Sequence, residues 1–198
     1  MKALKILGIT LVGLVALIGI VSAFLSPKQH LERSIVVNAP ASAVFEQINT
    51  FKNFTKWSPF AELDPNMKVT YEGPESGVGA KMSWAGNSEA GEGSQWIIES
   101  VQDKHIKTGL NFGGYDGTYS SEINLEPAEG GTKVTWTYDG DVSGTGMATS
   151  VMGKFMGLFM DGMLGPMYEK GLGKLKTVAE SAPQPQAEQT PATEQPAK

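Results

Sequence analysis

The sequence predicts an α+β domain in which an antiparallel sheet is covered by one long helix near the C-terminus. Between residues 68 and 138, short segments alternate apolar and polar residues with a period of two, as half-buried strands do. Glycine-rich turns, such as Gly113-Gly114 and Gly130-Gly131, separate these segments at hairpin spacing. Residues 147–179 then carry apolar side chains at helical spacing, and they form the only segment long and apolar enough to cover the inner face of the sheet.

The chain begins with an apolar segment that is long enough to cross a bilayer. Lys2 and Lys5 precede an uncharged run over residues 6–25, and about 20 helical residues span about 30 Å of hydrocarbon. Its length favours an uncleaved signal anchor, with the domain on the exported, periplasmic or extracytoplasmic side of the membrane. A secretory signal peptide cleaved after Ala23 stays open, because Val21-Ser22-Ala23 is an acceptable small-residue site, and the domain would then be secreted.

The elements of the domain are expected in a simple order. A strand over Glu32–Val37 is followed by a helix that Pro40 opens, since proline suits the first helical turn, and that runs to about Ile48. A second short helix covers Phe51–Trp57 and ends at Ser58-Pro59. The further strands are expected at Lys68–Tyr71, Ala80–Trp84, Ser94–Val101, His105–Phe112, Tyr115–Leu125 and Thr132–Tyr138. The Ser94–Val101 strand is apolar on both faces, so its inward face stays undecided.

The long helix, Met147–Ala179, holds six of the nine methionines of the chain. Four of them fall within an arc of about 80° when each residue turns the helix by about 100°; these are Met152, Met156, Met160 and Met163. Gly165-Pro166 predicts a break or kink, with a second segment to about Glu180. Because methionine adapts to irregular space and to varied ligands, this face is either ordinary core or the wall of a cavity.

The composition excludes several classes of function. The net charge is −5 and no basic cluster occurs, so we expect no nucleic acid partner. The chain has no cysteine and two histidines, His30 and His105, so a thiolate metal site is excluded and a Ser–His–Asp triad or a multi-histidine zinc site is hard to build. The segment Asp139-x-Asp141-x-Ser143-Gly144 matches the start of a calcium loop, but Ser150 stands where a bidentate acid is needed. We therefore expect no metal and no cofactor.

Short motifs along most of the chain resemble one family. In chain order they are Glu32–Pro40 (ERSIVVNAP), Val44-Phe45, Trp57–Phe60 (WSPF), Gly91–Ser94 (GEGS), Gly131–Trp136 (GTKVTW), Glu169–Leu172 (EKGL) and Leu175-Lys176. Residues 31–180 thus resemble the START/Bet v1-like (SRPBCC) superfamily, and within it the bacterial polyketide cyclase/dehydrase-like group. The resemblance implies a helix-grip fold, in which a curved antiparallel sheet wraps around a long C-terminal helix and encloses a cavity. Many relatives carry an acidic residue where this chain has Thr50-Phe51, so no role of that acid is carried over.

Three parts of the chain are expected. Residues 1–27 form the signal anchor or transmembrane helix, and residues 28–180 form the START/Bet v1-like domain. Residues 181–198 are rich in proline, glutamine, alanine, threonine and glutamate, a composition that cannot bury a core, so we expect a disordered tail.

The inward faces of these elements predict the residues of a ligand-binding cavity. The candidates are Trp57, Phe60, Met82, Trp84, Leu110, Phe112, Tyr119, Trp136, Tyr138, Met152, Met156, Phe159 and Met160. An apolar lining with a few polar groups is usual for small-molecule sites, and the hydroxyls of Tyr119 and Tyr138 would be the polar groups here.

Three functions stay open. The favoured one is a membrane-tethered binding or carrier domain for a hydrophobic small molecule, such as a lipid or isoprenoid, at the cell envelope. The second is a cyclase- or hydratase-type enzyme that uses a tyrosine or an inward carboxylate, Glu99 or Glu122, although both glutamates are expected to face solvent. The third is a non-catalytic envelope interaction module with a solid core. The family includes lipid carriers, sterol binders and aromatic cyclases, so the resemblance does not choose among them.

Overall fold

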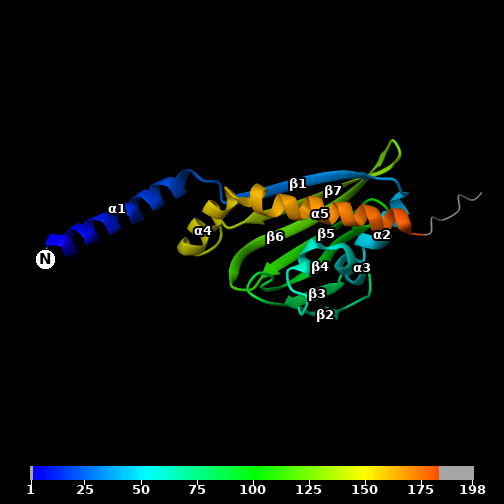
Figure 1. Cartoon of the computed structure of the whole chain (residues 1–198), viewed down its shortest axis with the longest axis horizontal. Coiled ribbons are helices and arrows are strands. Elements are labelled where there is room, and N and C mark those ends of the chain that lie inside the picture. The colour runs from blue at the N-terminus through cyan, green and yellow to red at the C-terminus, as the bar shows by residue number, and fades with distance from the viewer. Residues whose placement is uncertain (1, 183–198) are drawn as a thin grey trace, which may run out of the picture.

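The computed structural model describes residues 2–182, which form an N-terminal helix that projects from the domain, one seven-stranded antiparallel sheet, and the helices that this sheet curves around (Figure 1). The helices are α1 (Lys2–Phe24), α2 (Ala41–Ile48), α3 (Phe51–Trp57), the 3₁₀ helix η1 (Pro59–Glu62), α4 (Met147–Gly157) and α5 (Met160–Ser181). The strands are β1 (Lys28–Val37), β2 (Lys68–Glu72), β3 (Lys81–Ala85), β4 (Glu92–Val101), β5 (His105–Phe112), β6 (Tyr115–Ala128) and β7 (Gly131–Asp141).

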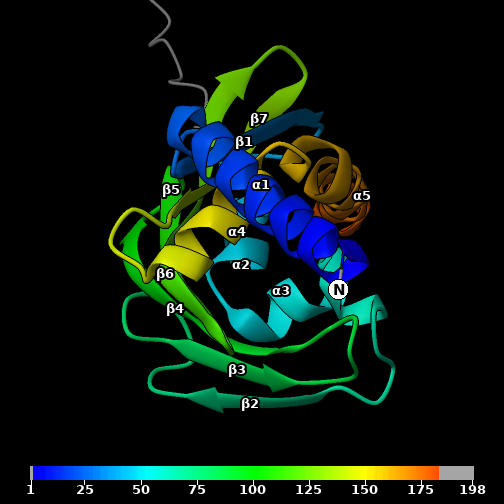
Figure 2. The same cartoon turned by 90° about the vertical axis from the view of Figure 1, so that its left-hand side faces the viewer.

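The strands lie in the order β1-β7-β6-β5-β4-β3-β2. Strands β2 to β7 are therefore a meander, and β1 pairs with the last strand, β7, through residues 28–37 and 132–141. Figure 2 shows the sheet curving from β1 and β7 to β2 around the helices. The α+β class and the helix-grip arrangement predicted from the sequence are confirmed.

Two irregularities in the strand ladder favour this curvature. The register shifts between β4 and β5 at Ile97/Glu99, and between β5 and β6 at Leu110/Phe112. A bulge of this kind bends a strand and increases its local twist. The middle strands can therefore turn around the helices without a break in pairing.

The inward face of β4, which the sequence leaves undecided, is the face of Gln95 and Ile97. Both side chains are buried, whereas Ile98 is exposed. Trp96 lies on the outer face above Gly109, its partner on β5, where an added Cβ would come within 2.5 Å of the indole ring. The glycine makes room for the ring, and the polar Gln95 is thereby turned inward.

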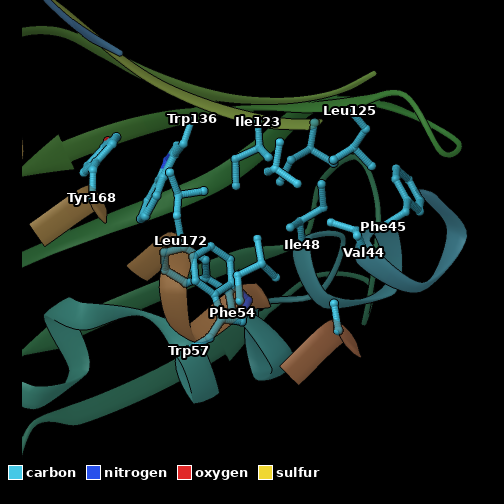
Figure 3. Close-up of a cluster of buried hydrophobic side chains, with 14 of the residues drawn as sticks. Val44, Phe45, Ile48, Phe54, Trp57, Ile123, Leu125, Trp136, Tyr168 and Leu172 are labelled. Carbon is cyan, nitrogen blue, oxygen red and sulfur yellow. The ribbon is translucent and has the colours of Figure 1, made fainter. Parts of the chain in front are cut away.

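The core is solid where α2, α3 and the second half of α5 cover the sheet, and we call this part the closed half. Its most buried aliphatic members, each at most 1 % exposed, are Val44, Ile48, Val134, Leu172 and Leu175. Figure 3 shows side chains of α2 meeting those of β6 across this interior. Complete removal of large aliphatic side chains from water is the main stabilising contribution of such a core.

Aromatic rings mark the boundary of the closed half. Trp57 of α3 meets Trp136 of β7 edge-on, with ring centroids 5.3 Å apart, and Tyr168 of α5 stacks on Trp136 at 3.9 Å. Gly171 faces the same tryptophan, and a Cβ there would lie 2.8 Å from the indole and 2.9 Å from Pro59. The glycine therefore lets α5 approach the sheet closely.

The C-terminal helix does not break where the sequence predicts. The break lies between α4 and α5, where the Leu158 N–H donates to the Phe155 carbonyl at 3.1 Å and the Phe159 N–H donates to the Met156 carbonyl at 3.0 Å. These bonds span three residues, so α4 ends in a tighter turn and the axis changes direction before α5 begins. The predicted break at Gly165-Pro166 is wrong, because both residues lie inside α5.

Gly165 has a packing role instead. The guanidinium of Arg33 occupies the space next to it that a side chain would fill. Arg33 donates through Nε to Glu169 and through Nη2 to Asp161, each at 2.8 Å. Strand β1 is thereby joined to the first half of α5.

Helix α1 is apolar and touches the domain through its last turn. Its segment Lys5–Phe24 is long and apolar enough to cross a membrane, a property that membrane anchors and signal sequences share. Most of its apolar side chains are exposed, as they would not be in a core helix. Ser22 is buried, and Lys154 Nζ of α4 donates to its carbonyl at 3.1 Å. The predicted disordered tail lies, from residue 183 onward, outside the described residues.

Candidate functional site

A cavity of about 510 Å³ lies between the concave face of the sheet and helices α4 and α5. Residues of β3, β4, β5, β6 and β7 form one side, and residues of α3, η1, α4 and α5 form the other. Small-molecule sites commonly enclose about 300–1,000 Å³ and are mostly apolar, as this lining is. The interior is therefore not solid at the α4 end of the fold.

Eleven of the thirteen residues predicted to line a cavity line this one. They are Phe60, Met82, Trp84, Leu110, Phe112, Tyr119, Trp136, Tyr138, Met152, Met156 and Met160. The strand residues among them share the inward face, and three of the methionines, Met152, Met156 and Met160, come from α4 and from the start of α5.

The other two predicted residues lie elsewhere. Trp57 is fully buried in the closed half, where its indole N–H donates to the Gln47 carbonyl at 3.0 Å and its ring packs against Phe54 at 4.9 Å. Phe159 precedes α5 and is 63 % exposed, because the break after α4 moves it away from the methionine face. Trp57 therefore supports the cavity from behind its lining, and Phe159 faces outward.

Sequence reasoning missed several lining residues. They include Gln29, Phe54, Ser58, Gln95, Ser121, Leu164 and Tyr168. Gln95 was hidden by the undecided face of β4, and Tyr168 was hidden because a break or kink expected at Gly165-Pro166 made the helical phase beyond Gly165 uncertain. The helical phase of α5 alone, started at Met160, would have placed Leu164 and Tyr168 together on one face.

A chain of hydrogen bonds crosses the inner sheet surface behind the apolar lining. The Gln95 amide donates from Nε2 to Thr108 Oγ1, and Thr108 Oγ1 donates to the Ser121 carbonyl, each at 3.1 Å. The Trp136 indole donates to Ser121 Oγ at 2.8 Å, and that hydroxyl donates to the Thr137 carbonyl at 2.7 Å. No fully buried side-chain polar atom of the described residues lacks a partner. These groups are satisfied without a ligand, as buried polar groups must be.

Three of the four tyrosines that line the cavity are buried, and these three keep their protons. Burial raises the pKa of Tyr119, Tyr138 and Tyr168, because a phenolate would lose its hydration there. The Tyr119 hydroxyl donates to the Asp116 carbonyl at 3.0 Å, and its ring stacks on that of Tyr138. The tyrosines are therefore neutral hydrogen-bonding groups near neutral pH rather than bases.

The charged residues of the lining lie at the rim. They are Glu89 and Glu92, and both are exposed. The other acids and bases considered from the sequence do not line the cavity: Glu99 pairs with His105 at 3.2 Å, and Glu122 also lies elsewhere. In residues 2–182, no group of three or more histidine, aspartate or glutamate side chains is arranged to hold a metal ion.

The comparisons with known proteins agree on the fold. A family model described as "Polyketide cyclase / dehydrase and lipid transport" matches residues 28–180. Among solved structures, a protein of Chromobacterium violaceum is similar with a TM-score of 0.52 and 16% identity, over 78% of this chain and 99% of that one. A Staphylococcus aureus protein of unknown function is similar with a TM-score of 0.57 and 14% identity, over 77% of this chain and 94% of that one.

A protein of a biosynthetic pathway is also among the similar structures. The di-domain ARO/CYC StfQ from the steffimycin biosynthetic pathway has a TM-score of 0.57 and 10% identity, over 77% of this chain and 51% of that one. At these identities the likeness shows a common fold and not a common reaction. Among curated proteins, no match to this sequence is found.

Proposed function

The chain belongs to the polyketide cyclase/dehydrase and lipid transport family, and we propose that within it the chain binds and carries a hydrophobic small molecule at the cell envelope. The observation that supports this most strongly is the cavity of about 510 Å³ with a mostly apolar lining. Removal of a ligand's apolar surface from water by such a lining would supply most of the affinity.

The charges around the cavity favour an uncharged ligand. No lining residue is cationic, and the two anionic ones stand at the rim, so a buried carboxylate or phosphate would have no counterion. Burial of an unpaired charge costs far more than burial of a hydroxyl or carbonyl group that finds a hydrogen bond. The Tyr138 hydroxyl and the Gln95 amide oxygen can make such bonds. We therefore expect an apolar molecule with a neutral polar group, such as an isoprenoid alcohol or a quinone.

Helix α1 supports a tethered carrier. Its apolar surface is exposed to the surroundings, and its last turn packs on α4 through Ser22 and Lys154. Cleavage after Ala23 would remove Ser22 and that contact. In our proposal α1 therefore stays attached and anchors the domain on the exported side of the membrane as a single-pass protein, which mass measurement of the mature N-terminus would test.

A second candidate function is a cyclase- or hydratase-type reaction, and it rests on Tyr119 and Tyr138 as lining residues. Their raised pKa values leave them able to donate a proton or a hydrogen bond but not to act as bases. With Glu99, Glu122 and His105 outside the cavity and Glu89 and Glu92 at its rim, the described residues offer no partner base in its interior. The carrier function needs no such group and is the better supported of the two.

Binding of a neutral fluorescent probe tests the carrier proposal. The full-length protein in detergent should bind Nile red, and Leu110→Trp, which fills the cavity, should weaken binding about tenfold or more. Ile98→Trp is the matched control, because Ile98 is on the exposed face of the neighbouring strand. An anionic fatty acid probe should bind more weakly than Nile red. Equal binding by the two variants would contradict the proposal.

A further inference from the structure

Exposed apolar side chains are concentrated in one segment of the domain, α4 and the start of α5. In the described residues, twelve large apolar side chains are exposed outside α1, and six of these lie between Met147 and Met163. They are Met147, Met152, Met156, Leu158, Phe159 and Met163, which we call the methionine surface. A soluble surface rarely leaves such a cluster open unless something binds to it.

The methionine surface lies beside the end of α1. Helix α4 is the part of the domain next to α1 (Figures 1 and 2), and Lys154 of α4 reaches the carbonyl of Ser22. Ser22 stands two residues before Phe24, the end of the apolar span, which is about 3 Å along a helix axis. A bilayer that surrounds α1 would therefore end at the level of α4.

The same surface forms part of the mouth of the cavity. Met152, Met156 and Met163 line the cavity and are also exposed at its edge. The connection between β3 and β4, with Glu89, contributes to the rim as well. A ligand that enters between these elements passes over methionine side chains.

We propose that the methionine surface rests in the hydrocarbon boundary of the membrane that holds α1, so that the cavity exchanges its ligand directly with the bilayer. This inference rests on the proposed function, since it takes α1 as the anchor. Helix α4, which carries much of this surface, is joined to the membrane end of α1 through Lys154 and Ser22, which makes lipid its nearest apolar partner. Unbranched thioether side chains adapt to fluid acyl chains as they adapt to irregular protein surfaces. Lys154, on the opposite side of α4 from the methionine arc, holds the helix at this depth.

Quenching of fluorophores by doxyl-labelled lipids tests the contact between the methionine surface and the bilayer. The chain has no cysteine, so Phe159→Cys and Met163→Cys give single labelling sites for an environment-sensitive fluorophore. The matched control is Glu129→Cys, in the exposed β6–β7 turn at the other end of the domain (Figure 1). With full-length protein in phosphatidylethanolamine/phosphatidylglycerol vesicles, doxyl-labelled lipids should quench the labels at 159 and 163 several-fold more than the label at 129. Equal quenching at the three positions would overturn the proposal.

Transfer kinetics separate this proposal from the carrier function. Met163→Asp should slow the movement of Nile red from vesicles into the tethered domain several-fold, while Ile98→Asp, at an exposed apolar position away from α4, should not. If transfer is slowed equally by both variants, the docking proposal is overturned and the carrier function still stands. If the labels at 159 and 163 are quenched but the cavity binds no probe, the membrane contact of the methionine surface stands, whereas the carrier function and the ligand exchange that depends on it are both overturned.

Discussion

The two halves of the interior differ in how the same sheet is covered. In the closed half, α2, α3 and the second half of α5 bury branched aliphatic and aromatic side chains completely, as at Ile48 and Leu172. At the other end, α4 buries none of its residues, and the methionines of α4 lie at the edge of the cavity, where they form part of the lining. The comparison teaches that one helix-grip sheet can be covered by a solid core at one end and by the lining of a cavity at the other. The side chains of the covering helices make the difference: branched aliphatic and aromatic residues in the closed half, and methionines at the cavity.

Large-to-small substitutions should show the greatest contrast between the halves. Leu172→Ala removes a side chain that is 1 % exposed and should lower the free energy of unfolding by about 2–5 kcal/mol. Met156→Ala, at a position 40 % exposed beside the cavity, should cost less than about 1 kcal/mol. Thermal unfolding in detergent, followed by circular dichroism, measures both. Similar losses for the two variants would show that the α4 end is packed as firmly as the closed half.

Two glycines in α5 allow a packed position and an open position to be compared within one helix. Gly171→Ala places a Cβ 2.8 Å from Trp136, so we expect a loss of about 1–3 kcal/mol in the free energy of unfolding. Gly173→Ala meets no atom within 4 Å and should be neutral or stabilise the helix by up to about 1 kcal/mol. Denaturant titration of the two variants gives the difference. If Gly171→Ala proves as stable as Gly173→Ala, α5 is not held closely against the sheet.

Acid titration should reveal a smaller effect at the outer side of the closed half. Hydrogen bonds from Lys170 and Lys174 lower the pKa of Glu62 from its ordinary 4.5 to about 2. Because the folded-state pKa is the lower one, the pairing stabilises the fold above about pH 4.5, and this contribution is lost as the pH falls toward about 2. Glu62→Gln should therefore flatten the pH dependence of the melting temperature in that window. The effect should be small, since the side chains are largely exposed.

Glu129→Gln, in the exposed turn between β6 and β7, is the control for the acid titration. It should leave the acid dependence of the melting temperature as it is in the unsubstituted protein. A pH profile that is identical for Glu62→Gln and the unsubstituted protein would show that η1 is not joined to α5 through this cluster.

Much of the fold could be predicted because its signals are local. Period-two alternation located the strands, and the methionine spacing identified the helix that faces them. The inward face of β4 could not be predicted, because the position of Trp96 depends on Gly109 in the next strand. The role of Gly165 was also hidden, because this glycine makes room for Arg33, a residue distant in sequence, and does not end the helix. The contact between Trp96 and Gly109 turns Gln95 toward the cavity, and the break after α4 leaves Phe159 exposed.

The contents of the cavity test the central claim most directly. Full-length protein purified from its membrane in mild detergent should be analysed by native mass spectrometry and by extraction into organic solvent. We expect a neutral, apolar molecule at a near-stoichiometric amount, and its loss in Leu110→Trp but not in Ile98→Trp. An unsubstituted protein that carries no apolar molecule, and that takes up none when mixed with a membrane lipid extract, would contradict the proposed carrier function.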